Sequence, residues 1–415
     1  MRHTNCAARV GCLPVSLKAG KATFSGLITA AIGLTALPAQ AQIYNWQPRP
    51  DIGDSYISKD MPQPVCASVN GVGKILIFSN FDFYKSQNLN NMSNAVRVGE
   101  ITTPADTYVL KPGSLPGKRY AFAVASHTPA GGNSVVYLFG GRNGGGDMAD
   151  VYAYDPAAST FTPVTDASGG SVDLPTPRSG VTAVSSGGLI WLFGGLSGNQ
   201  VLNEVLVFDP VGKTITARPP MSKGFHGARA MVKAVGTAHH VYFVGAKLVA
   251  TGGPTYEIYR YRTIPTIGTL LTVLDGQAGG APMQSAAHPA SPMVTWDPSG
   301  TVRPITAGGY GANGNWTWDR FEAGRLVDSY SNGSSNPTAT LSSAPYVTPP
   351  RARDMAGAVK CGSFTYLVGG NYGHGSKLQD RSRLLDRLGP PGRGDIKAEA
   401  IKANTGIKLG PVQPE

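Results

Sequence analysis

The chain has 415 residues, with 54 Gly, 32 Pro, only 15% charged residues and a formal net charge of +11. This composition is too apolar, and too often interrupted by turn-forming residues, for a disordered protein. The length is sufficient for a large core and would by itself favour two or three domains, but a repeat fold removes that inference.

The first 41 residues have the features of an export signal. They carry four Lys or Arg residues and no acid, then an apolar stretch over 24–37, then the small-x-small site Ala39-Gln40-Ala41. The apolar stretch is shorter than the roughly 20 residues of a membrane span, which disfavours the alternative of a retained anchor. We therefore expect residues 1–41 to be a signal peptide and the mature protein to be secreted or periplasmic, with no membrane span.

A unit of about 18 residues then recurs along the chain. Its first half alternates small and apolar residues, its second half is a continuous apolar run, and it ends in two small residues, usually Gly-Gly. The six copies span 63–80, 119–141, 178–195, 229–246, 292–309 and 353–370, the second being five residues longer at its turn. The first half predicts an inner strand, and the second half a strand that is buried on both faces.

Two outer strands are expected after each unit. They are clearest over 150–164 and 204–218, where the pairs Asp155-Pro156 and Asp209-Pro210 predict tight turns. Weaker versions occur at 256–262 and around 318–329. The last unit lacks a recognisable outer pair, so we expect a strand from the other end of the chain, with 43–46 as the candidate. Residues 376–415 are expected to be a disordered or weakly structured basic tail.

This pattern resembles the kelch repeat of the β-propeller superfamily that includes the central domain of galactose oxidase. The resemblance rests on the Gly pairs, the Tyr or Trp before them and the Asp-Pro turns. It implies an all-β, kelch-type β-propeller of about six four-stranded blades over residues 42–375. The chain departs from the family pattern at Ser79-Asn80 and Gly245-Ala246, which replace Gly pairs, and at Phe161 and Ile215, which stand where the family often has Trp.

One face of such a propeller should carry the candidate ligand-binding residues, because the start of each unit and the loop after each Gly pair lie on the same side. These candidates are Arg119, Arg178, Arg229, Arg353, Arg142, Asn143, Tyr310, Asn313, Trp316, Asn371, Tyr372 and His374. The first four are expected at equivalent positions. They can either bind a carboxylate or brace neighbouring blades through backbone carbonyls, as Arg does in many kelch repeats.

No motif assigns catalytic residues, a metal site or a cofactor. His127, His226 and the pair His239-His240 form no ligand cluster, and the Gly-rich 141–147 segment does not precede a helix. We expect a binding module for a protein or glycan, an acidic sugar included, acting as a monomer and without nucleic acid as a partner. The alternative is a sugar mutarotase of the sialic-acid type acting in the central channel. Copper radical oxidase chemistry is disfavoured because the chain ends before the further domain that it needs.

Two cysteines remain after the expected cleavage. Cys66 and Cys361 lie in the first and last units, which ring closure makes neighbours. Their positions along the two inner strands differ, however, so the sequence leaves a disulfide between them open.

Overall fold

A computed structural model shows an all-β protein with six four-stranded antiparallel sheets. The described residues are 45–52, 63–78, 97–117, 119–235, 238–244, 247–250, 258–264, 271–274, 293–296, 303–306, 324–329, 338–343, 356–372, 379–380 and 385–389. Within them no helix is long and apolar enough to cross a membrane. The expected signal peptide lies outside these residues.

The first three sheets follow the chain from their inner to their outer strand. They are β2 (Gln63–Val69), β3 (Val72–Phe78), β4 (Arg97–Thr102) and β5 (Thr107–Ser114); then β6 (Ala123–His127), β7 (Val135–Phe139), β10 (Val151–Asp155) and β11 (Thr160–Pro163); then β12 (Thr182–Ser186), β13 (Leu189–Phe193), β16 (Val205–Asp209) and β17 (Thr214–Arg218).

The remaining sheets are, in the same order, β18 (Arg229–Val235), β19 (Ala238–Val244), β20 (Ile258–Ile264) and β21 (Leu271–Leu274); then β22 (Met293–Trp296), β23 (Arg303–Thr306), β24 (Gly324–Ser329) and β25 (Thr338–Ser343); and finally β26 (Gly357–Cys361), β27 (Phe364–Val368), β30 (Leu385–Gly389) and β1 (Asn45–Arg49). In the sheet of β22–β25 and in β21 the strands are described without their side chains.

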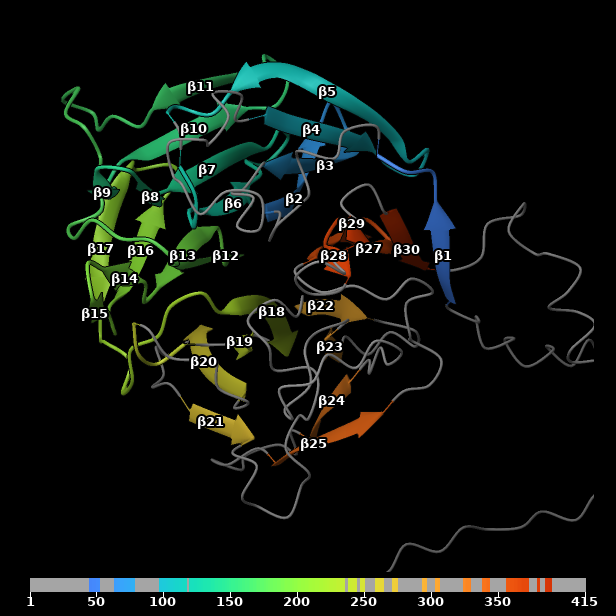
Figure 1. The fold of residues 1–415 in the computed structure, drawn as a ribbon. Coiled ribbons are helices and arrows are strands. Elements are labelled where there is room, and N and C mark those ends of the chain that lie inside the picture. The colour runs from blue at the N-terminus through green and yellow to red at the C-terminus, as the bar shows by residue number, and fades with distance from the viewer. Residues whose placement is uncertain are drawn as a thin grey trace, which may run out of the picture. The chain divides into compact units, whose positions relative to one another are not determined.

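The inner strands form a closed ring. Each of β2, β6, β12, β18, β22 and β26 contacts the next, and β26 contacts β2 again. In Figure 1 the strands β5, β11, β17, β21, β25 and β1 lie at the periphery. The propeller architecture is therefore confirmed, and all six predicted units form the two inner strands of a sheet.

The core lies between neighbouring sheets rather than inside one. Between the sheets of β12 and β18, for example, Phe193 packs edge-on against Phe243 with ring centroids 4.9 Å apart. The equivalent cluster between the sheets of β6 and β12 contains Phe139 and Phe208. The continuous apolar runs are buried on both faces for this reason.

The Asp-Pro turns form as predicted between the two outer strands. The carboxylate Oδ1 of Asp155 accepts from the backbone N–H of Ala157 at 2.8 Å, and that of Asp209 from Val211 at 2.8 Å. Each aspartate thus satisfies the backbone of its own turn.

The closure of the last sheet differs from the sequence interpretation. The expected tail supplies β29 (Gln379–Asp380) and the buried strand β30. The expectation of an unstructured segment from residue 376 is therefore wrong for these two strands. The outermost strand does come from the other end of the chain, as β1, shifted from the expected 43–46. The short sequence LDRLG of β30 carries no turn signal and little alternation that would reveal it.

Two further contacts join the first and last sheets. Cys66 and Cys361 form the disulfide that the sequence left open, with Cα atoms 5.3 Å apart. The buried Asp106 carboxylate, after β4, pairs with Arg49 of β1 and Arg387 of β30 and accepts from the Tyr366 hydroxyl of β27. The pKa of Tyr366 is raised, mainly because the hydroxyl is buried and then because of the Asp106 charge.

Candidate functional site: the mouth of the central channel

The Gly pairs attach each sheet to the start of the next unit. The backbone N–H of Gly141 donates to the carbonyl of Arg178 at 2.9 Å, and that of Gly195 donates to Phe225 at 2.8 Å. Gly194 has φ +61°, and a Cβ there would lie 2.1 Å from the Phe225 carbonyl oxygen. Only glycine permits this close approach, which explains in steric terms why this unit ends in glycine.

These contacts also define which residues are equivalent between blades. Residues 120, 179 and 226 each form a bridge with the residue that follows the small pair, namely Arg142, Leu196 and Lys247. The preceding positions, Arg119, Arg178 and Phe225, are therefore equivalent. Arg229 is instead equivalent to Thr182, which is four positions further along the unit than Arg178. Arg229 and Thr182 each lie directly opposite the residue that precedes the small pair of their own unit. The expected equivalence of Arg229 with Arg178 is wrong.

The cause of the shift is the length of one hairpin. The inner strands of the β18 sheet pair over seven positions, whereas those of the β12 sheet pair over five, and two residues separate the paired strands in each case. At the same distance before the small pair, a residue therefore lies on the inner strand in the longer hairpin of β18–β19, but before the inner strand in the shorter hairpin of β12–β13.

Arg119 and Arg178 are internal braces. The Arg178 side chain is 1% exposed, donates to the carbonyls of Thr176 and Gly194 and pairs with the Glu204 carboxylate. Arg119 donates to the carbonyl of Gly140 at 3.2 Å and forms a two-pronged pair with Asp150 at 2.7 and 2.8 Å. These two arginines therefore brace the fold, as the second alternative in the sequence analysis predicted. They join the strands of their own sheet, however, and not two neighbouring blades.

The other candidates divide into three groups. Arg142 pairs with Asp147 at 3.6 Å in the hairpin of β8 (Arg142–Asn143) and β9 (Gly146–Asp147), and Asn143 caps its turn by accepting from the backbone N–H of Gly145. Asn371 and Tyr372 form β28, paired with β29, and their side chains are not described. The remaining five candidates lie outside the described residues, namely Arg353, Tyr310, Asn313, Trp316 and His374.

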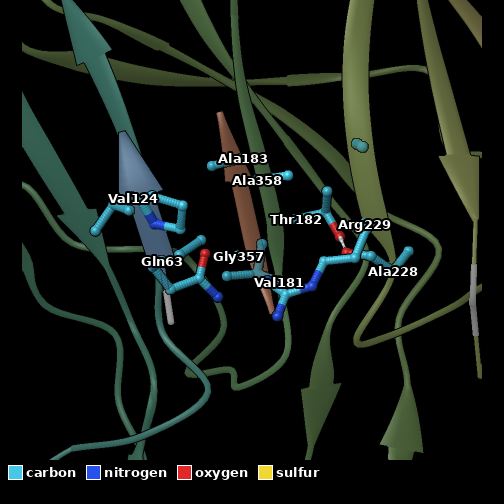
Figure 2. Close-up of a pocket in the computed structure, with 12 residues that line it drawn as sticks. Gln63, Val124, Val181, Thr182, Ala183, Ala228, Arg229, Gly357 and Ala358 are labelled. Carbon is cyan, nitrogen blue, oxygen red and sulfur yellow. Dashed lines mark hydrogen bonds between the residues drawn. The ribbon is translucent and has the colours of Figure 1, made fainter. Parts of the chain in front are cut away.

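A cavity of about 120 Å³ opens where the inner strands begin. It is lined by residues from five blades, namely Gln63, Pro64, Ala123, Val124, Val181, Thr182, Ala183, Ala228, Arg229, Ala230, Gly357 and Ala358. Gln63, Thr182 and Arg229 occupy equivalent strand positions, each opposite the residue before the small pair. In Figure 2 the side chains of Gln63 and Arg229 extend from different strands toward the space between them. The cavity is therefore the mouth of the central channel.

The lining is mostly small and apolar. Its described polar side chains are Gln63, Thr182 and Arg229, and the Thr182 hydroxyl already donates to the Ala228 carbonyl at 3.0 Å. Arg229 differs from the two braces, because its Nε and Nη2 are closed off from solvent and have no hydrogen-bond partner among the described residues. Burial lowers the pKa of Arg229 to about 10. The sequence pointed to this residue, but assigned it to the wrong position.

Three short hairpins lie on the same face as the cavity mouth. Besides β8–β9 and β28–β29, the hairpin of β14 (Leu196–Ser197) and β15 (Gln200–Val201) follows a Gly pair. The backbone N–H of Gly198 donates to Asp147 at 2.6 Å, which ties two of these hairpins together. No group of three or more His, Cys, Asp or Glu residues that could hold a metal occurs in the described part.

Comparisons with known proteins agree with this architecture. The model of the KLHDC2/KLHL20/DRC7 Kelch-repeats domain matches residues 72–263. Alpha-scruin of Limulus polyphemus is 31% identical over 132 residues, and beta-scruin of the same organism is 29% identical over 134. These matches cover 30% of this chain and only 13% and 14% of the two relatives.

A solved structure titled "Structure of YjhT" has the same fold, with a TM-score of 0.53 and 13% sequence identity. The match covers 82% of this chain and 95% of that one. The chain therefore has the propeller fold of that structure, and its residues 72–263 are similar to kelch repeats.

Proposed function

We propose that this protein is an exported binding module that holds a protein or glycan on the face where its inner strands begin. The observation that carries the proposal is the cavity at the channel mouth, built by five blades and flanked by the short hairpins of the same face. Because the cavity is lined by inner strands rather than by loops, its geometry is preorganised for a ligand.

Export is supported by one feature of the sequence and one feature of the structure. Residues 1–41 have the order of a cleavable signal, and the Cys66–Cys361 disulfide is of the kind that persists in oxidising compartments. Mass spectrometry of protein expressed with its full N-terminus should give a mature chain that begins at Gln42 and lacks two hydrogens at the cysteine pair. A cytosolic chain that begins at Met1 would contradict export.

Binding is favoured over mutarotation by the described lining of the cavity. Proton transfer to and from a sugar needs a positioned acid or base. The described lining residues include one Arg and no Asp, Glu or His. We therefore propose recognition rather than catalysis for this face.

The test is a pair of substitutions on opposite faces. Asn199 is exposed in the β14–β15 hairpin, whereas Ala157 is exposed in an Asp-Pro turn at the other side of the ring. The mature chain is screened on glycan and peptide arrays, and each hit is repeated with Asn199→Trp and Ala157→Trp. We expect Asn199→Trp to weaken binding and Ala157→Trp to leave it unchanged. The reverse pattern would overturn the assignment of the binding face.

A further inference from the structure

Arg229 is the one charged side chain among the described residues that line the cavity. A guanidinium withdrawn from water without a partner is costly, and folded proteins rarely retain one that has no task. Its Nε and Nη2 are both closed to solvent and lack a hydrogen-bond partner in the described part of the chain. The two rim arginines, by contrast, each have carbonyl and carboxylate partners.

The described residues around the cavity provide no anion for Arg229. The described lining contains no acid, and Gln63 contributes a neutral amide that can donate as well as accept. Nearby on the same blade, burial lowers the pKa of Lys247, and no acid pairs with this lysine among the described residues. The rim and mouth of this blade therefore favour a negative group brought by a ligand.

We propose that the channel mouth binds a carboxylate group of the ligand, held by the Arg229 guanidinium with the Gln63 amide beside it. This rests on the proposed function and names the chemical class of its ligand. The planar fork of a guanidinium matches the two oxygens of a carboxylate. A single cation with a neutral amide balances one negative charge, which favours a carboxylate over a dianionic phosphate.

The size of the cavity limits what enters it. Drug-sized ligands usually occupy several hundred cubic ångströms, and this space is about 120 Å³. The carboxylate and a few adjoining atoms therefore enter, while the rest of the ligand lies outside against the hairpin face. The small side chains of Ala123, Ala183 and Ala358 leave room for this end of the ligand.

The experiment uses a minimal probe, so that it does not depend on knowing the partner. Propionate and its neutral analogue propionamide are titrated into the mature chain, and binding is followed by protein NMR shifts. The variants are Arg229→Met and, as a matched control that removes a positive charge from the same blade, Lys223→Met, an exposed lysine outside the cavity lining. Retained folding of each variant is checked by thermal unfolding.

We expect weak, saturable propionate binding by the wild type and by Lys223→Met, no binding of propionamide, and a loss of about tenfold to 100-fold in Arg229→Met. Equal binding of propionate and propionamide, or affinity unchanged in Arg229→Met, would overturn the proposal. Tighter binding of inorganic phosphate than of propionate would overturn the assignment to a carboxylate.

Two further arms identify the source of the carboxylate. Glucuronate is compared with glucose, and a short peptide with a free C-terminus is compared with its amidated form. Preference for the charged member of either pair, lost in Arg229→Met, supports the proposal and names the source, whereas no preference in both pairs contradicts it. Array hits that depend on Asn199 but not on Arg229 would leave the binding face standing while rejecting the carboxylate site.

Discussion

Arg178 and Arg229 lie on neighbouring blades and in the sequence look like copies of one residue, yet the structure treats them in opposite ways. Arg178 is buried and all its partners belong to its own blade, namely two carbonyls and the Glu204 carboxylate. Arg229 stands on an inner strand at the channel mouth with two nitrogens unpartnered among the described residues. The same residue type thus stabilises the fold at one place and, on our proposal, serves recognition at the other.

The largest loss of stability is expected at Gly194, where one blade contacts the start of the next. Gly194→Ala should lower the free energy of unfolding by about 4 kcal/mol, because it adds the cost of a left-handed backbone to a Cβ overlap with the Phe225 carbonyl. Gly188→Ala is the matched control, since Gly188 has φ +78° but nothing within 4 Å of its Cβ position. Denaturant unfolding that gives equal losses for both would contradict the steric account.

The second largest loss of stability is expected when the Arg178 side chain is replaced. Arg178→Met is expected to destabilise the protein by about 3 kcal/mol, because the carbonyl of Gly194 and the Glu204 carboxylate lose their partner inside the blade. Glu204→Gln should cost less, since the Glu204 side chain is 39% exposed and its amide can still accept a hydrogen bond. Chemical denaturation of the two variants measures the difference.

At the channel mouth, replacing the arginine should raise the stability instead of lowering it. Arg229→Met is expected to stabilise the free protein by about 1 kcal/mol, because a guanidinium with two nitrogens closed off and unpartnered among the described residues is replaced by an apolar side chain of similar length. Thermal unfolding without ligand decides the sign. A loss of stability comparable to that of Arg178→Met would show that Arg229 is a brace as well.

The smallest effect concerns the rim of the same blade. Burial is the main cause that lowers the pKa of His226 from its usual value, with the charge of Lys247 acting in the same direction and a hydrogen bond to the Val249 carbonyl opposing it. The folded protein therefore binds this proton less readily than the unfolded chain. The associated stability is present above pH ~6.5 and is lost as the pH falls through that value toward the folded pKa.

His226→Gln should remove this part of the pH dependence. The melting temperature of the wild type is expected to fall by about 1 °C more than that of the variant between pH 7.5 and 5.5, a small change because the imidazole is only half-buried. If the melting temperatures of the wild type and of His226→Gln fall equally over this pH range, protonation of His226 does not affect the stability of the folded protein.

Local patterns predicted most of the ring. Each inner hairpin joins residues close in sequence, so its alternation, its apolar run and its turn are all visible within a short window, and the six units emerge as β2–β3, β6–β7, β12–β13, β18–β19, β22–β23 and β26–β27. The Asp-Pro turns are equally local. The sequence therefore determined the fold class and the face on which the inner strands begin.

What the tertiary structure decided depends on pairs of residues far apart or on small differences in length. The register of Arg229 changed because its hairpin is two pairs longer than that of the preceding blade, a difference that counting from the small pair cannot detect. The last blade needed β30 and β1, which meet across most of the chain, with Trp46 opposite Leu388. Whether an arginine has a partner depends on this register, because Arg178 reaches the Gly194 carbonyl and the Glu204 carboxylate from its place before the inner strand of its own blade.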